Sequence, residues 1–187
     1  MEDKINTQLI DRCINGNRDG QFKLYNLMLP YLNAICKRYL TNTTDLKDVL
    51  QDTFISLFKN LHKFNPKKAS IKTWTTTIAI NNCLKYNAKN AKKPTEQLIA
   101  DIHSTPITPV AFENITIAEI LSYLKQMPQP QYEVFNLYVI DEFSHKEISL
   151  MLGIKTSLSR KRLSRARTWI KERIESDSEF HFNFALL

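Results

Sequence analysis

Apolar residues recur at helical spacing along almost all of this 187-residue chain. Between residues 21 and 40, one such stripe consists of Phe22, Tyr25, Leu29, Leu32 and Cys36. Steps of three and four bring side chains to one face of an α-helix, whereas no run alternates convincingly enough to predict a sheet. The chain holds only three glycines, which excludes a Gly-rich phosphate-binding loop and argues against a turn-rich β-sandwich. We therefore predict an all-α fold.

Breaks in this periodicity divide the chain into two halves. The N-terminal half predicts a short helix ending at Gly16, a helix over residues 21–40 with a kink at Pro30, a third helix from Thr44 or Asp45 to Leu61, a loop over residues 64–70, and a fourth helix from Ser70 or Thr73 to about Ala91. The C-terminal half predicts helices over residues 115–126, 131–139, 144–152 and 157–175, then an apolar tail. Prolines interrupt the pattern between them. We predict two small helical domains, 1–93 and 115–187, joined by a flexible linker over 94–114.

The net charge of +7 is distributed unevenly along the chain. Residues 1–93 carry a net charge of +9, residues 94–127 carry −3, and residues 128–187 carry +1. Between Lys155 and Arg173, eight residues are basic and only Glu172 is acidic. Two basic surfaces joined by an acidic connector favour nucleic acid as the partner. A membrane surface is the weaker alternative, because neither segment has the broad apolar face of an interfacial helix.

The sequence favours a cytoplasmic location. No apolar stretch approaches the roughly 18 residues of a membrane span, and the first residues lack the basic and apolar regions of a signal peptide. Cys13, Cys36 and Cys83 are scattered and form no C-x-x-C pair. This pattern is typical of buried free thiols in a reducing compartment.

Nothing in the sequence favours an enzyme. Metal-dependent cleavage of nucleic acid needs clustered carboxylates, yet residues 53–95 contain none. The histidines His62, His103, His145 and His181 show no metal-ligand spacing. We expect no catalytic residue, no metal and no cofactor.

Residues 144–175 predict a helix-turn-helix. Ser144-His145-Lys146-Glu147 has the form of a capping box, in which the Ser hydroxyl and the Glu carboxylate satisfy free amides at a helix start. Gly153 lies where the turn needs a positive φ. In the second helix, the residues expected to face the core are Leu158, Leu163, Ala166, Ile170 and Ile174. Its exposed first turns, which would enter the major groove, carry Ser157, Ser159, Arg160, Lys161, Arg162 and Arg165. A basic helix that faces only solvent is the alternative.

The first basic surface has a different character. Its loop and helix interleave lysines with Phe64, Asn65, Thr73, Thr75, Thr76, Asn81, Asn82, Tyr86 and Asn87. Amides and hydroxyls that read base edges, beside rings that stack, suit unpaired strands as well as duplex. For Trp74, packing in the core is favoured over stacking on a base.

Several motifs occur together in a fixed order. They are Asp45-Leu46-Lys47-Asp48-Val49-Leu50-Gln51-Asp52-Thr53-Phe54, then Thr73-Trp74 and Ile78-Ala79-Ile80-Asn81, and finally Met127-Pro128, Ser144-His145-Lys146-Glu147-Ile148, Leu152-Gly153-Ile154 and Leu163-Ser164-Arg165-Ala166-Arg167. The first resembles the region 2.2 pattern D-x-x-D-[LIV]-x-Q-[ED]-x-F, and the last group resembles region 4, of a group IV (extracytoplasmic-function) sigma factor of bacterial RNA polymerase, in the sigma-70 family. The resemblance covers most of the chain.

This resemblance implies a transcription initiation factor that binds the β and β′ subunits of core RNA polymerase and makes no chemical bond itself. Region 2 would contact and help melt the −10 element of promoter DNA, and region 4 would read the −35 element. The core-binding residues it implies are Asp48, Gln51, Asp52, Phe54 and Phe58. The −10 contacts are Phe64, Asn65, Lys67, Lys72, Trp74, Thr75, Asn81, Asn82, Lys85 and Lys89. The −35 contacts are Lys155, Ser157, Ser159, Arg160, Lys161, Arg162 and Arg165.

The chain departs from the family pattern at a few positions. Ile80 and Ala88 stand where Arg is usual, and Lys85 stands where an acidic residue is usual. Ser157-Leu158-Ser159 replaces the common Gly-Thr-Val, and we expect Leu158 to supply the missing apolar contact after a small rotation of the helix. Many relatives are held inactive by an anti-sigma factor, which is a further candidate partner. The alternative function is a helix-turn-helix regulator that acts without polymerase and would not need the region 2-like half.

Overall fold

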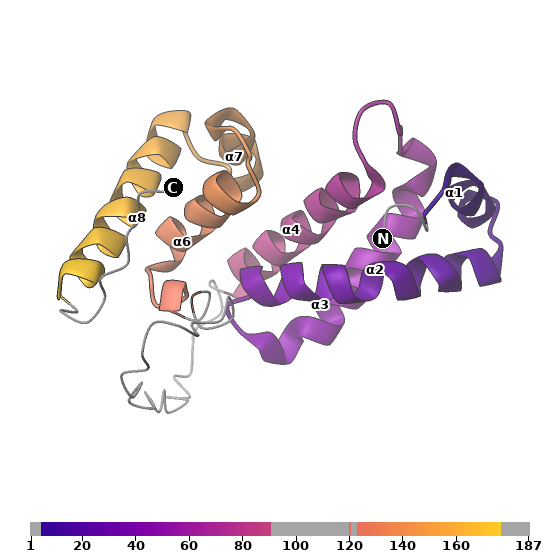
Figure 1. Ribbon diagram of the computed structural model, residues 1–187, viewed down its shortest axis with the longest axis horizontal. Helices are drawn as coiled ribbons and strands as arrows, with labels where there is room; N and C mark the ends of the chain where they lie inside the picture. The colour runs from indigo at the N-terminus through magenta and orange to yellow at the C-terminus, as the bar shows by residue number, and fades with distance from the viewer. Residues whose placement is uncertain (1–4, 91–119, 121–122, 177–187) are drawn as a thin grey trace. The chain divides into compact units, whose positions relative to one another are not determined.

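The computed structural model describes residues 5–90, 120 and 123–176, with side chains up to residue 173. It divides into two compact units, Met1–Glu96 and Gln97–Leu187, and each is treated by itself below (Figure 1). Every regular element among the described residues is helical, as predicted. The linker over 94–114, the C-terminal tail and all but a few residues of the helix expected over 115–126 lie outside the described part of the chain.

The first unit is built on three long helices. Its elements are α1 (Thr7–Ile14), α2 (Arg18–Tyr39), a 3₁₀ turn (Thr43–Asp45), α3 (Leu46–Asn60), a second 3₁₀ turn (Leu61–Lys63) and α4 (Ile71–Asn90). The helices α2, α3 and α4 pack against one another in all three pairings, and α1 packs on α2. Each of the helices α2, α3 and α4 therefore buries one face against the other two. This packing determines which of their residues remain on the surface.

The core of this unit follows the predicted stripes only in part. Leu32 of α2 is fully buried as expected, and so are Leu24 of α2, Leu57 of α3 and Ile80 of α4. Leu24 was not in the predicted stripe of α2, and the prediction that Phe22 belongs to it was wrong, because Phe22 is 67% exposed. Burial of Ile80 explains the apolar residue where the family usually has Arg, because this position faces the interior. The helix α2 continues through Pro30, which is exposed. Proline has no backbone N–H to donate, but the loss of this one hydrogen bond leaves the rest of the helix in place.

Asparagine side chains, which were not predicted as caps, cap the first two helices. The Asn6 Oδ1 accepts from the Leu9 amide at 2.9 Å, and the Asn17 Oδ1 accepts from the Gly20 amide at 2.8 Å. Asp45 stands at the N-cap position of α3, as predicted, but without the side-chain hydrogen bond of a cap. Asn42 caps the preceding 3₁₀ turn through the Thr44 amide.

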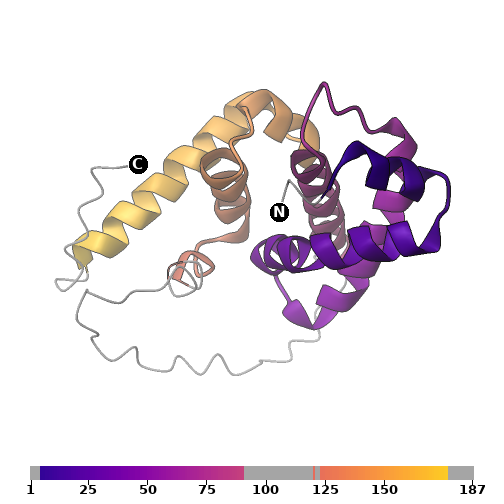
Figure 2. The ribbon, with the colours of Figure 1, turned by 45° about the vertical axis from the view of Figure 1, so that its right-hand side comes forward.

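The second unit contains the helix-turn-helix. Its elements are α6 (Gln129–Phe135), a π-helical turn (Asn136–Ile140), α7 (His145–Leu152) and α8 (Thr156–Ser176). The long helix α8 packs against both α6 and α7, and Figure 2 shows α6 lying along the middle of it. Leu137, Ile148 and Ala166 are fully buried between these elements. The side chain of Ile174, expected to face inward, lies beyond the described side chains.

Candidate functional sites

A groove with a volume of 550 Å³ lies between α2 and α3. Its lining residues are Tyr25, Leu29, Lys47, Leu50, Gln51, Phe54, Ile55 and Phe58. The ring centroids of Tyr25 and Phe54 are 4.4 Å apart, and those of Phe54 and Phe58 are 6.3 Å apart. A row of three rings therefore runs along the groove. Ile55 beside them is 55% exposed, and exposed apolar area around a groove is typical of a protein-binding surface.

The groove includes three of the five residues predicted to bind the polymerase core. Gln51, Phe54 and Phe58 line it, whereas Asp48 and Asp52 are exposed on α3 and are not part of its lining. Phe54 is only 5% exposed, so it contributes one ring face and otherwise belongs to the core.

Sequence reasoning missed part of this groove. Tyr25 and Leu29 were assigned to the inward stripe of their helix, but both are half-buried at its edge. Ile55 was not noticed at all. The available signal was its place off the inward stripe of α3 and one residue after Phe54, since several apolar residues close together at the surface mark an interaction site.

The loop between α3 and α4 is shaped by its own side chains. The Asn65 Oδ1 accepts from the Lys67 amide at 2.9 Å, and the Lys68 amide donates to the Asn65 carbonyl at 3.0 Å. The Phe64 and Trp74 ring centroids lie 5.6 Å apart and both side chains are half-buried. Trp74 thus packs mainly on Phe64 and keeps part of its surface exposed. The Ser70 Oγ caps α4 by accepting from the Thr73 amide at 3.1 Å.

The predicted −10 contacts on α4 do not all reach the surface. The expectation that Thr75 contacts DNA was wrong, because Thr75 is fully buried and its hydroxyl donates to the Ile71 carbonyl at 2.8 Å. Asn82 faces α3, where its amide nitrogen lies 3.4 Å from the Thr53 hydroxyl. Asn81 is half-buried.

Lysines make up the outer part of this surface. Lys67, Lys85 and Lys89 are exposed. Lys72 is half-buried, and its ammonium lies 5.1 Å from the centre of the Tyr31 ring. That cation–π contact holds the lysine over α2 while its charge remains on the surface.

The helix-turn-helix has the predicted turn chemistry. The Ser144 Oγ accepts from the Glu147 amide at 3.3 Å, and the Glu147 carboxylate accepts from the Ser144 amide at 2.8 Å. The Ser144 hydroxyl also donates to this carboxylate at 2.6 Å. Gly153 ends α7 with φ 63°, the left-handed conformation that glycine adopts at least cost. The capping box and the turn are both confirmed.

The first turn of helix α8 differs from the expectation, whereas the later turns agree with it. Ser159 was predicted to be exposed, and this was wrong: it is fully buried. Its hydroxyl lies 2.9 Å from Nδ1 of His145, so a polar side chain occupies an interior position without an unsatisfied hydroxyl. Leu158, predicted to turn inward, is 37% exposed instead. Leu163, Ala166 and Ile170 are buried as expected.

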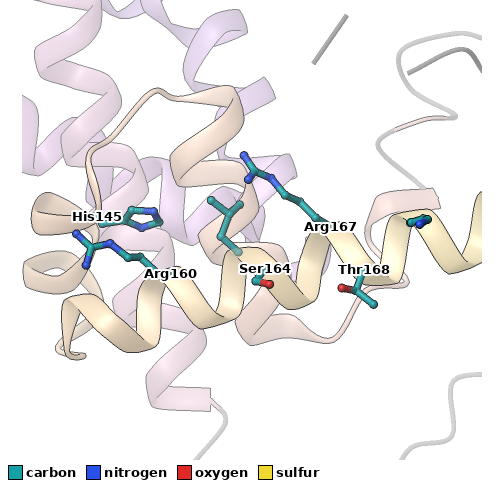
Figure 3. Close-up of a pocket in the computed structure, with 7 residues that line it drawn as sticks. His145, Arg160, Ser164, Arg167 and Thr168 are labelled. Atoms are coloured by element: carbon teal, nitrogen blue, oxygen red, sulfur yellow. The ribbon is translucent and has the colours of Figure 1, made fainter. Parts of the chain in front are cut away.

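A second hollow, with a volume of 370 Å³, lies beside α8. The ring of His145, on α7, stacks on Tyr138 with a centroid separation of 4.5 Å. Figure 3 shows the guanidinium of Arg160 next to this ring and the side chain of Arg167 on the same side of α8. Burial, together with the positive charges of Arg160 and Arg167, lowers the pKa of His145. The sequence did not single out Arg167 or His145 as site residues.

The described residues hold no group of three or more histidines, cysteines and carboxylates that could bind a metal ion. Among the described helices, none combines the length and the hydropathy needed to cross a membrane. All three cysteines are buried and free, as predicted.

Comparison with known proteins finds two matching family models. Residues 24–93 match the model of sigma-70 region 2, and residues 117–170 match that of sigma-70 region 4. Together they span about two thirds of the chain. The chain belongs to the sigma-70 family. It is a transcription initiation factor of the extracytoplasmic-function class, which directs RNA polymerase to promoters.

Individual relatives are distant but similar over most of their length. The RNA polymerase sigma factor HrpL of Pseudomonas syringae pv. syringae is 26% identical over 79% of this chain and 83% of its own. The ECF RNA polymerase sigma-E factor of Haemophilus influenzae is 22% identical over 90% of this chain and 97% of its own.

Two solved structures have the same fold at 22% identity. One is CnrH in complex with the cytosolic domain of CnrY, with a TM-score of 0.51 over 91% of this chain and 97% of that one. The other is the sigma factor RpoE in complex with the anti-sigma factor NepR from Bartonella quintana, with a TM-score of 0.57 over 83% and 96%.

Proposed function

We propose that this sigma factor binds core polymerase through the α2–α3 groove, contacts the −10 element with its α4 surface, and reads the −35 element with α8. The observation that carries the proposal is the order of the two matched regions on two separate units. A DNA-binding regulator that acts alone needs only the second. The chain itself makes and breaks no bond in this proposal, and it acts in the cytoplasm, where polymerase and chromosome meet.

The core-binding surface consists of the groove and the acidic residues beside it. An apolar helix of a β or β′ subunit would cover Ile55 and Phe58, while Asp48, Gln51 and Asp52 on the exposed side of α3 would meet basic and polar groups. Burial of apolar area supplies most of the affinity in such an interface, and the charges supply orientation.

The −10 surface combines a shaped loop with lysines. Lys67, Lys85 and Lys89 are free to meet phosphates. The exposed parts of Phe64 and Trp74 offer ring faces on which a base released from the duplex can stack. Asn65 holds the loop through its own hydrogen bonds, and Thr75 is dropped from the set because it is buried.

The −35 surface consists of the first turns of α8 and the turn before it. The residues retained for it are Lys155, Ser157, Arg160, Lys161, Arg162 and Arg165. Arginine can donate two parallel hydrogen bonds to guanine in the major groove. Ser159 is dropped, since its hydroxyl is buried against His145.

An anti-sigma factor is a further proposed partner. Both solved structures named above are complexes of two proteins, and one of them is a sigma factor bound to an anti-sigma factor. An inhibitor that covered the α2–α3 groove would compete directly with polymerase. Pull-down of the chain from its native cells, with and without excess core polymerase, tests whether such a protein binds and whether the two compete.

Reconstituted transcription tests the main proposal. Purified chain with core polymerase should start RNA synthesis at promoters that core alone ignores. Ile55→Asp should abolish this activity and co-purification with core, because it places a charge in the groove. The matched control is Phe22→Asp, since Phe22 is also an exposed apolar residue (67%) of this unit but does not line the groove. Equal behaviour of both variants would refute the groove as the core-binding site.

A further inference from the structure

The residues around the hollow beside α8 form a strip that shares only Arg160 with the predicted −35 contacts. Arg160, Ser164, Arg167 and Lys171 follow one another at steps of four, three and four, which places them on one side of the helix. At about 100° per residue, Arg162 and Arg165 lie about 160° and about 140° around the helix from Arg160, on the side away from this strip. A helix in the major groove turns one side to the bases, and its flanking side meets the phosphates.

The chemistry of the hollow suits a single anionic group. Its lining contains three cationic side chains, two hydroxyls and an imidazole, and no carboxylate. A volume of 370 Å³ is large enough for a phosphate group with its ordered water. Arginine and lysine donate charge-assisted hydrogen bonds to phosphate oxygens, and hydroxyls add neutral ones.

The imidazole of His145 is held in a fixed orientation. Its Nδ1 is 2.9 Å from the buried Ser159 hydroxyl, and its ring stacks on Tyr138 at a centroid separation of 4.5 Å. Only Nε2 remains for a ligand. Because α7 carries His145 and α8 carries the cations, an anion in the hollow would contact both helices of the motif at once.

We infer that this hollow is a phosphate-binding site, formed by His145, Arg160, Arg167 and Lys171, which holds one backbone phosphate of the duplex next to the −35 element. The inference rests on the proposed binding of duplex by this unit. It also changes the role of Arg160, which contacts a phosphate at this site and leaves base recognition to Lys161, Arg162 and Arg165. In the free protein the guanidinium charges of Arg160 and Arg167 help to lower the pKa of His145. A phosphate here would offset these two charges and would therefore raise the His145 pKa.

Neutral phosphates in the DNA test the site directly. Holoenzyme binding is measured on promoter duplexes in which single phosphates around the −35 element are replaced by uncharged methylphosphonates. Wild type should lose about tenfold in affinity at the contacted phosphate, the loss expected for one charge-assisted hydrogen bond. Arg167→Ala and Lys171→Ala should each be less sensitive than wild type at that same phosphate, and each should reduce the slope of log affinity against log salt by about 1 on any sequence.

The matched control is Lys146→Ala, which removes an exposed lysine of α7 that does not line the hollow. It should keep the methylphosphonate profile of wild type. If Lys146→Ala and Lys171→Ala change the methylphosphonate profile and the salt slope equally, the positive charges attract the DNA without a defined site, and the proposal is refuted. Unchanged methylphosphonate sensitivity in Arg167→Ala would overturn the proposal as well.

The NMR signals of the His145 ring distinguish a phosphate of the DNA backbone from free inorganic phosphate. With duplex, the His145 pKa should rise in wild type and not in Arg167→Ala, and His145→Gln assigns the signal. A rise with millimolar inorganic phosphate but none with duplex would overturn the proposal in favour of a free-anion site. Loss of all promoter binding by wild-type holoenzyme would refute the proposed function instead, and this outcome does not depend on the variants.

Discussion

Removal of the capping box at the start of α7 should destabilise the second unit by a predictable amount. Ser144→Ala deletes the hydroxyl that accepts from the Glu147 amide at 3.3 Å and donates to its carboxylate at 2.6 Å. It leaves the 2.8 Å bond from the Ser144 amide to Glu147 in place. Loss of an N-cap hydroxyl costs about 1 kcal/mol, which lowers the melting temperature of a domain of this size by about 4–8 °C.

Glu147→Gln should cost less, because the amide oxygen can still accept from the Ser144 backbone. What it removes is a charge at a helix N-terminus, worth about 0.3–1 kcal/mol and reduced here by exposure to solvent. Since Ser144 and Glu147 contact each other, the double variant should cost less than the sum of the two single variants.

The charge contribution has a defined dependence on pH. Hydrogen bonds from the Ser144 side chain and amide lower the pKa of Glu147 in the folded unit. A lowered carboxyl pKa stabilises the fold above the unfolded value of about 4.3, and this stabilisation is lost as the pH falls through the folded pKa. The difference between wild type and Glu147→Gln should be constant from pH 7 to about 5 and should shrink below it.

Urea unfolding followed by tryptophan fluorescence measures these effects in the correct unit. The chain has two tryptophans, Trp74 in the first unit and Trp169 in the second, so a Trp74→Phe background reports on the second unit alone. A loss below 0.3 kcal/mol for Ser144→Ala at pH 7, where caps typically contribute about 1, would refute the reasoning. So would a cost of Glu147→Gln that stays the same at pH 3.5 as at pH 7.

Three further predictions concern buried groups. Ile80→Ala should cost about 2–5 kcal/mol in urea unfolding, because it empties a fully buried position; a cost below 1 would show that this position is not well packed. Cys13, Cys36 and Cys83 should react with a disulfide reagent only after denaturant is added, because all three are buried and burial raises the pKa of Cys13; a fast-reacting thiol in the native chain would contradict this. Acidification below the unfolded pKa of about 6.5 should destabilise wild type more than His145→Gln, since the lowered His145 pKa means that the unfolded state takes up its proton first; equal melting curves from pH 7.5 to 5.5 would contradict it.

Several features could be predicted from the sequence because they depend on neighbouring residues. The capping box and the glycine turn were found correctly, since a cap is made by residues three positions apart and a left-handed turn by a single glycine. The helical stripes also predicted part of the core, including Leu32, Leu163 and Ala166, but they missed Leu24 and Met28. The asparagine caps were missed, although Asn17 stands directly before a helical run and has the right chemistry.

The surfaces were harder to predict, because a shift of one residue turns a side chain by about 100° around a helix. Ser159 and Thr75 have small hydroxyls that find partners inside the fold, at His145 and at the backbone of the same helix. Polarity alone therefore placed both on the surface, which was wrong. Tyr25 and Leu29 show the opposite error, since apolar character alone does not tell a core residue from one that lines a groove.

The sequence by itself determined that this protein is helical, where its helix-turn-helix begins and which family it resembles. These properties depend on periodicity and on short-range hydrogen bonds, which the chain encodes locally. The tertiary structure alone decided which side of each helix is covered. That choice depends on the neighbouring helix, as when α7 brings His145 over Ser159 and leaves Arg160 and Arg167 around an open hollow.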